Sequence, residues 1–383
     1  MPLVPSRQPD MTLGQRLWQV NWLLVLLITV TASVGFVMLY SAADGNIEPW
    51  AYRQMVRFSA GMVVMLVVAV SNIHFWLRNA YLIYTACLIL LIAVEFFGSA
   101  GMGAKRWIDL GIITLQPSEL MKIVIILVLA RYFYASRMED VERPTYLIVP
   151  LILLAVPMVL ILRQPDLGTA ILLVVSGVAV FFLAGVRLWI FVTGGIAILG
   201  SIAPIWNFVL LDYQKARLLT YLRPERDPLG AGYHVMQSKI ALGSGGLFGK
   251  GFMAGSQSHL SFLPENHTDF IFTMLAEEFG LFGGLLLLTL YFLIMVYGFV
   301  ISLRCRHHFG RLIGMGIVMV FFLNYFVNIA MVMGLLPVVG MPLPLVSYGG
   351  TSLLTHMIGF GLVICIFVHR DITLRPGAAD ISL

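Results

Sequence analysis

The chain contains ten apolar runs, each about as long as a helix that crosses a lipid bilayer, and these runs limit the folds open to it. Such a helix needs on the order of 20 apolar residues. The runs fall at 20–40, 55–71, 79–97, 118–134, 146–162, 167–185, 188–207, 270–301, 311–334 and 347–369. Charged residues make up only 11% of the chain, whereas a soluble domain is roughly a quarter charged. The sequence therefore predicts an all-α, polytopic membrane protein with about ten transmembrane helices.

The arrangement of the loops predicts a topology for a single integral-membrane domain over residues 1–383. Its parts outside the membrane are an N-terminal segment (1–19), a large loop between the seventh and eighth helices (208–268) and a tail (370–383). Ten helices place both termini on one side. The short loops on the other side carry only Arg53, Arg57, Lys105, Arg106 and Arg163. Because the short loops on the terminal side are the more basic, and basic short loops stay in the cytoplasm, we expect cytoplasmic termini and an extracytoplasmic 208–268 loop.

Composition also bears on partners and cofactors. The net charge is +5, but the basic residues are scattered between helices, so no nucleic-acid partner is expected. Cys87, Cys305 and Cys365 show no CxxC spacing and predict no disulfide framework. The histidines show no metal-ligand pattern, so no dedicated metal site is expected. A divalent cation, Mg²⁺ or Mn²⁺, is left open as a cofactor.

Polar motifs gather at the starts of the fourth, sixth, eighth and tenth helices, which all begin on the outer side in this topology. They are residues 116–119, 164–169, 266–269 and 344–351. The first turn of a helix presents free N–H groups and the positive end of the helix dipole, and both attract an anion. The motifs therefore predict a phosphate or pyrophosphate site at the outer face. The alternative is that four helices merely have good caps.

Asp269 stands where the long loop meets the eighth helix. A carboxylate that is half removed from water at the edge of a membrane costs free energy, and such residues are commonly functional. The alternative is that Thr268 or Asp269 caps the first turn.

Two further charged groups lie near the fourth helix. Lys105 and Arg106 precede Trp107, an arrangement that suits a phosphate beside a sugar, or an interfacial aromatic anchor with basic neighbours. Glu119 and Lys122 are spaced i,i+3 and share a helix face, so they form either part of the site or a structural ion pair.

The long loop contains two recognisable segments. Residues 233–242 have amphipathic helical spacing and predict an interfacial or re-entrant helix on the outer surface. The glycine-rich stretch 243–251 lacks the spacing of a phosphate-binding P-loop, and we expect it to be a flexible loop.

The ordered set of motifs resembles the SEDS family (shape, elongation, division and sporulation) of bacterial glycosyltransferases. The resemblance covers about residues 15–371 and is carried by Arg-Trp-Ile at 106–108, Gln-Pro-Ser-Glu-Leu-Met-Lys at 116–122, Gln-Pro-Asp-Leu-Gly-Thr at 164–169, Leu-Pro-Glu-Asn-His-Thr-Asp-Phe at 263–270 and Pro-Leu-Val-Ser-Tyr-Gly-Gly at 344–350. Two further stretches, 227–240 and 335–344, are closer to the elongation branch of the family than to its division branch.

This resemblance implies residence in the bacterial cytoplasmic (inner) membrane and polymerisation of lipid II into peptidoglycan glycan strands on its outer side. It implies a catalytic role for Asp269 and substrate-binding roles for Lys105, Arg106, Trp107, Glu119, Lys122, Asp166 and Ser347. It also implies a class B penicillin-binding protein and other membrane proteins of the elongation complex as partners.

The implied chemistry agrees with the residues. A hydroxyl nucleophile needs a general base, which a carboxylate can supply, and one displacement predicts inversion at the anomeric carbon. The rival hypothesis is a flippase for the same lipid, because carriers also direct helix N-termini at anions. A flippase should show polar residues at both faces, whereas here they cluster at one.

Overall fold

The computed structural model describes residues 11–101, 104–109, 111, 114–136, 138–209, 214–215, 219–221, 231–259 and 266–372. Residues 227–230 and 263–265, which carry part of the family resemblance, lie outside these ranges.

The N-terminal half forms α1 (Leu13–Trp18), α2 (Trp22–Ala42), α3 (Ala51–Val70), α4 (Ile73–Phe97), α5 (Pro117–Tyr134), α6 (Met138–Val141), a 3-10 turn (Pro144–Leu147), α7 (Ile148–Arg163) and α8 (Leu167–Leu183). The remainder forms α9 (Leu188–Gly200), α10 (Ile202–Pro204), a π-helical turn (Ile205–Val209), α12 (Ala231–Ser244), α13 (Ser256–His259), α14 (Ile271–Arg304), α15 (His308–Val332) and α16 (Gly350–Val368). Each of the ten apolar runs overlaps a helix for most of its length, so the helical prediction is confirmed.

Within the described residues, seven helices are long and apolar enough to cross a membrane, or eight if the bent pair formed by α9 and residues 202–208 is one span. Two predicted spans fall outside this set for evident reasons. Helix α8 has only 17 residues, and α5 carries Glu119, Lys122 and Arg131. The chain is an integral membrane protein.

A small antiparallel sheet between α4 and α5 adds to the expected all-helical fold. It comprises β1 (Ser99–Gly101), β2 (Ala104–Asp109) and β3 (Thr114–Leu115), paired in the order β1-β2-β3. The segment is short and lies between two strong helical signals, so its strands leave no visible pattern in the sequence.

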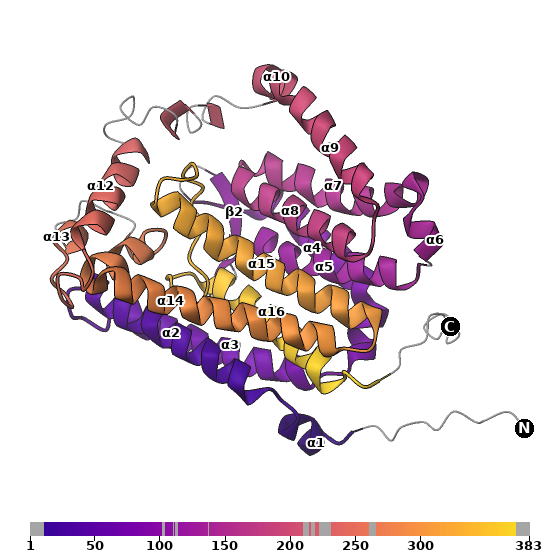
Figure 1. The fold of residues 1–383 in the computed structure, drawn as a ribbon, viewed down its shortest axis with the longest axis horizontal. Coiled ribbons are helices and arrows are strands. Elements are labelled where there is room, and N and C mark those ends of the chain that lie inside the picture. Colours follow the sequence, from indigo (N-terminus) through magenta and orange to yellow (C-terminus); the bar gives the residue numbers. More distant parts are fainter. Residues whose placement is uncertain are drawn as a thin grey trace, which may run out of the picture.

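The bundle is built around α16, nearly all of whose residues are buried. Its close approach to α3 depends on Gly361, where an added Cβ atom would lie 2.7 Å from the backbone oxygen of Met65. Small residues at such crossings let membrane helices pack backbone to backbone. By contrast, α9 contains no buried residue and projects away from the bundle (Figure 1).

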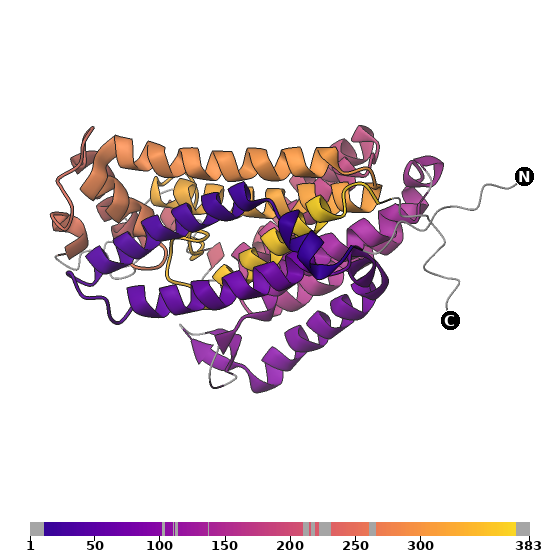
Figure 2. The ribbon, with the colours of Figure 1, turned by 90° about the horizontal axis from the view of Figure 1, so that it is seen from below.

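The long helices run roughly along one direction (Figure 2). Helix α1 and the C-terminal end of α16 lie toward one end, and α12 and α13 lie at the other (Figure 1). Helix α12 confirms that residues 233–242 are helical.

The prediction of a flexible loop at 243–251 is wrong. Gly245 and Gly249 lie so close to α14 that an added Cβ atom would be 2.1 Å from the oxygen of Ala276 and 2.0 Å from that of Glu278. The glycines therefore permit close backbone packing rather than flexibility. We call residues 245–257, which lie along α14, the strap.

Candidate active site

The four polar helix starts converge at one end of the bundle, as the sequence predicts. Gln116, before α5, donates from Nε2 to Asp166 Oδ2 at the start of α8 (3.2 Å). Thr351, in the first turn of α16, donates from Oγ1 to the oxygen of Thr114 (2.8 Å). Ser347, before α16, donates from Oγ to the oxygen of Thr268, before α14 (2.5 Å). These bonds join the openings of α5, α8, α14 and α16.

The segment that carries Asp269 is held by three consecutive backbone carbonyls. The oxygen of His267 accepts from Tyr348 N (2.9 Å), that of Thr268 from Ser347 Oγ, and that of Asp269 from Asn328 Nδ2 (2.9 Å). The donors come from α15 and from the segment before α16. Hydrogen bonds to three successive residues fix the backbone and restrict where the Asp269 side chain can lie.

Asp269 itself is half-buried. The N-cap residue of α14 is Phe270, which makes no capping hydrogen bond with its side chain, so neither Thr268 nor Asp269 occupies the cap position. The carboxylate lies against Gly340, where an added Cβ atom would be 3.5 Å from Asp269 Oδ2. The 338–342 loop therefore forms one wall beside this carboxylate.

Two aromatic contacts shape the surroundings of Asp269. The His267 ring stacks on Trp50 with centroids 4.4 Å apart. The Arg57 guanidinium lies 4.6 Å from the ring centroid of Tyr348. Its Nε would be 3.3 Å from a Cβ atom added at Gly350, so Arg57 lies at the opening of α16. It adds positive charge to the same end of the bundle.

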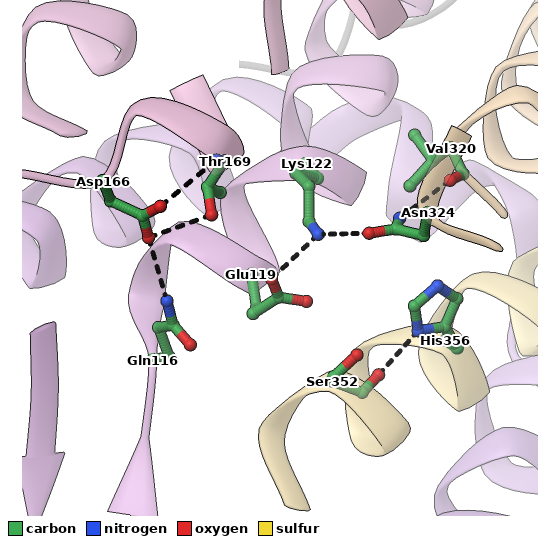
Figure 3. Close-up of polar contacts among 9 residues, drawn as sticks. All are labelled: Gln116, Glu119, Lys122, Asp166, Thr169, Val320, Asn324, Ser352 and His356. Atoms are coloured by element: carbon green, nitrogen blue, oxygen red, sulfur yellow. Dashed lines mark hydrogen bonds and ion pairs between the residues drawn. The ribbon is translucent and has the colours of Figure 1, made fainter. Parts of the chain in front are cut away.

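The Glu119 and Lys122 side chains form a buried ion pair with Nζ–Oε1 of 2.8 Å (Figure 3). Lys122 also donates to Asn324 Oδ1 on α15 (3.0 Å). Lys122 is 1% exposed and Glu119 is 5% exposed. Among the described residues, Glu119 Oε2 has no hydrogen-bond partner. The structure thus contains the expected ion pair and also leaves one carboxylate oxygen able to accept another bond.

Asp166 and Ser347 have their polar atoms engaged by the protein. Asp166 is the N-cap of α8, accepting from Thr169 N (3.2 Å) and Thr169 Oγ1 (2.9 Å) in addition to Gln116 (Figure 3). Ser347 Oγ accepts from Leu343 N (2.8 Å) as well as donating to Thr268. Both side chains hold backbone segments of the site together.

Strand β2 positions the three residues expected to meet the substrate near α5. Side chains alternate along a strand, so Arg106 projects oppositely to its neighbours. Its Nε donates to the oxygen of Gln164 (3.1 Å) and its Nη2 to that of Pro165. Lys105 is exposed and Trp107 is half-buried. Arg106 thus links β2 to the turn before α8.

Four residues that build this site were not predicted from the sequence: Gln54, Arg57, Asn324 and Asn328. Gln54 donates to the oxygen of Ser347 (2.9 Å) and is fully buried. Asn324 and Asn328 are spaced i,i+4 within an apolar run. Placing an amide in such a run costs free energy unless the amide is hydrogen-bonded inside the bundle. Two asparagines in one apolar run therefore indicate a polar contact in the bundle, and both could have been predicted on that ground.

No three His, Cys, Asp or Glu side chains are grouped to hold a metal ion in the part of the chain that the structure describes. The groups at this end of the bundle are the half-buried carboxylate of Asp269, the cations Arg57, Arg106 and Lys122, and four helix N-termini. This combination suits proton removal from a neutral nucleophile next to an anionic leaving group.

Comparison with known proteins decides the family. Residues 18–372 match the model of the FtsW/RodA/SpoVE family, described as cell cycle protein. The chain belongs to this family. The match covers nearly the whole sequence, including all four polar helix starts.

Individual relatives agree. The chain is 45% identical over 347 residues to a protein of Escherichia coli (strain K12) named peptidoglycan glycosyltransferase MrdB, covering 90% of this chain and 93% of that protein. It is 34% identical to the peptidoglycan glycosyltransferase RodA of Treponema pallidum (strain Nichols), covering 90% and 97%.

Solved structures share the fold. A chain from a structure titled "Structural coordination of polymerization and crosslinking by a peptidoglycan synthase complex" matches with TM-score 0.79 and 31% identity, covering 92% of this chain and 98% of that one. The rod shape determining protein RodA of Thermus thermophilus matches with TM-score 0.70 and 28% identity, with the same coverage.

Proposed function

We propose that this protein is a peptidoglycan glycosyltransferase that polymerises lipid II into glycan strands during cell elongation. The observation that carries the proposal is the convergence of Asp269, cationic side chains and four helix N-termini at one end of the bundle. The names of the family relatives MrdB and RodA support the same activity.

In this proposal Asp269 is the general base. The 4-hydroxyl of the acceptor GlcNAc attacks the anomeric carbon of the donor MurNAc, and its proton passes to the Asp269 carboxylate. The bond to the undecaprenyl pyrophosphate breaks, and the leaving group takes the electron pair. One displacement inverts the anomeric carbon, so a product that retained the donor configuration would contradict the scheme.

The pyrophosphate needs positive potential as its charge develops. Arg57 and Arg106 lie at the openings of α16 and α8, and the N–H groups of these openings and of α5 add to that potential. Lys105, next to Arg106 on β2, adds an exposed positive charge. Trp107 offers an aromatic face for a sugar. Lys122, paired with Glu119, supplies charge deeper in the bundle. Asp166 and Ser347 position these openings rather than contact substrate through their engaged polar atoms.

The proposal includes the orientation of the protein in the membrane and a partner protein. We place the active end outside the cytoplasmic membrane and both termini in the cytoplasm, because the short loops on the terminal side are the more basic. The match to a chain from a peptidoglycan synthase complex supports a crosslinking enzyme, a class B penicillin-binding protein, as the partner.

The test measures two activities of one preparation. The purified protein is incubated with fluorescent lipid II and a partner whose crosslinking site is blocked, and in parallel is placed in vesicles to follow lipid II movement between leaflets. Glycan strands made by the complex and not by the partner alone are the expected result. Movement between leaflets without any polymer would overturn the proposal in favour of a flippase.

A further inference from the structure

Helix α14 is divided at Gly280 into two parts with different surroundings. Gly280 has φ 66° and ψ −160°, a conformation essentially restricted to glycine. Before the break, every residue of 271–278 is buried. After it, burial follows a single stripe: Gly284, Leu287, Tyr291, Ile294, Gly298 and Ile301. The first part is an internal helix, and the second is a helix with one face against the bundle.

The strap replaces the hydrogen bonds that α14 loses at this break. A regular helix would join Leu281 N to the oxygen of Glu277, and Phe282 N to that of Glu278. Instead Leu281 N donates to Gly246 O (3.0 Å) and Phe282 N to Leu247 O (3.2 Å). The two carbonyls released in this way, those of Glu277 and Glu278, accept from Lys250 N (3.0 Å) and Gly251 N (3.0 Å).

A charged contact accompanies this exchange. Glu277 is fully buried, and its Oε1 accepts from Lys250 Nζ (2.7 Å) and Gln257 N (2.9 Å). The Lys250 side chain is 27% exposed, so the pair lies just beneath the surface of the protein. A buried carboxylate that loses its partner is strongly destabilised. The strap therefore holds α14 through both backbone and charge.

The first part of α14 is also attached to three other elements. Near its N-terminus, Asn328 of α15 binds the oxygen of Asp269. One turn further on, Ser238 of α12 hydrogen-bonds Thr273 (2.7 Å). Next to the break, Ser41 of α2 donates to Glu278 Oε1. With the strap, these contacts set the orientation of a two-turn helix that has Asp269 at its head.

We propose that Lys250 and Glu277 are positioning residues for glycosyl transfer, acting on Asp269 through the first part of α14. The proposal rests on the function proposed above. A helix broken at a glycine can pivot unless it is held, and the Lys250–Glu277 pair joins the strap to the last turn before the pivot. Removing the lysine charge draws water to the Glu277 carboxylate, loosens the strap and shifts Asp269 relative to the 338–342 loop.

The kinetic test uses Lys250→Met, Lys250→Arg and the double variant Lys250→Met/Glu277→Gln. Lys250→Met is expected to lower kcat for lipid II polymerisation roughly 10- to 100-fold with little change in KM, because small displacements of a catalytic group act on the chemical step. Lys250→Arg keeps the charge and retains most activity. The double variant recovers part of the loss, because its buried carboxylate is gone. Arg187→Met, which removes a surface ion pair with Glu142, serves as the matched control and keeps wild-type kcat.

A second readout does not depend on catalysis. Hydrogen–deuterium exchange of each intact variant reports on residues 245–257 and 271–282, and faster exchange confined to these segments in Lys250→Met is expected. Unchanged exchange there would overturn the proposal. Faster exchange with normal kcat would overturn the positioning role while leaving the proposed function intact. Absence of polymer from the wild-type protein would instead contradict the proposed function.

Discussion

At the scale of single residues, buried amides and hydroxyls hold the backbone of the site. Asn328 is fully buried, and its Nδ2 donates to the oxygens of both Asp269 and Met341 (2.9 and 2.6 Å). It therefore joins the segment that carries the carboxylate to the loop that faces it.

Replacing Asn328 with leucine tests this bridge. Asn328→Leu leaves two carbonyls without their donor, so we expect a loss of about 1–3 kcal/mol in unfolding free energy and a fall in kcat larger than the lost fraction of folded protein. Thermal unfolding and lipid II polymerisation measure the two effects. Asn79→Leu, on the exposed surface of α4, is the control. Equal kcat for Asn328→Leu and wild type would show that the bridge does not position Asp269.

Variants of the Glu119–Lys122 pair distinguish its contribution to stability from its contribution to activity. Lys122→Met leaves a buried carboxylate uncompensated and should cost about 3–5 kcal/mol of unfolding free energy. The double variant Lys122→Met/Glu119→Gln should recover most of that stability but not polymerisation, since the cation itself is needed beside an anionic substrate. Recovery of both properties would make the pair purely structural.

At the scale of elements, the break in α14 depends on one glycine. Gly280→Ala forces a side chain into φ 66° and places its Cβ atom 2.3 Å from Gly249 N. We expect severe destabilisation, of about 3 kcal/mol or more. Gly194→Ala in α9, where a Cβ atom meets nothing within 4 Å, should be neutral or stabilising by up to about 1 kcal/mol. Comparable melting temperatures for the two variants would show that the strap and α14 do not pack as described.

The turn between α14 and α15 should make stability depend on pH. Burial, and then the nearby His369, lowers the pKa of His307 to about 4. In the unfolded chain His307 takes up a proton below about pH 6.5, so the folded state loses stability as pH falls from 6.5 toward 4, by on the order of 2 kcal/mol at pH 5. His307→Asn keeps the acceptor that caps α15 through Gly310 N but cannot titrate in this range. Its melting temperature should fall less than that of wild type between pH 7.5 and 5, and an equal fall would assign the effect elsewhere.

At the scale of the whole molecule, the helices could be predicted because each is a long apolar run with a polar or proline-containing start. The gathering of their polar starts could be predicted because alternate helices in a membrane begin on the same face. The sheet could not be, since its strands are two to six residues long. The strap was misread because glycines that allow close packing and glycines that allow flexibility look alike until the neighbouring backbone is known.

The candidate site, like the fold, could be predicted only in part. The sequence motifs place Asp269, Glu119, Lys122 and Arg106 at one end of the bundle. They do not indicate that Asp166 and Ser347 bind backbone, because hydroxyls and carboxylates serve caps and substrates equally well. Asn324 and Asn328 lie within an apolar run, where the cost of an amide in lipid was the only available signal. Gln54 precedes such a run and follows Arg53, so its sequence position gave no signal.

Polymerisation of fluorescent lipid II by Asp269→Asn and Asp269→Ala tests whether Asp269 is the base for glycosyl transfer. The control is Asp109→Asn, which replaces an exposed aspartate on β2. Each protein is first shown to be folded and bound to its partner. We expect wild type and Asp109→Asn to make glycan strands and both Asp269 variants to lose at least about 100-fold in kcat. Normal polymerisation by Asp269→Asn would contradict this role.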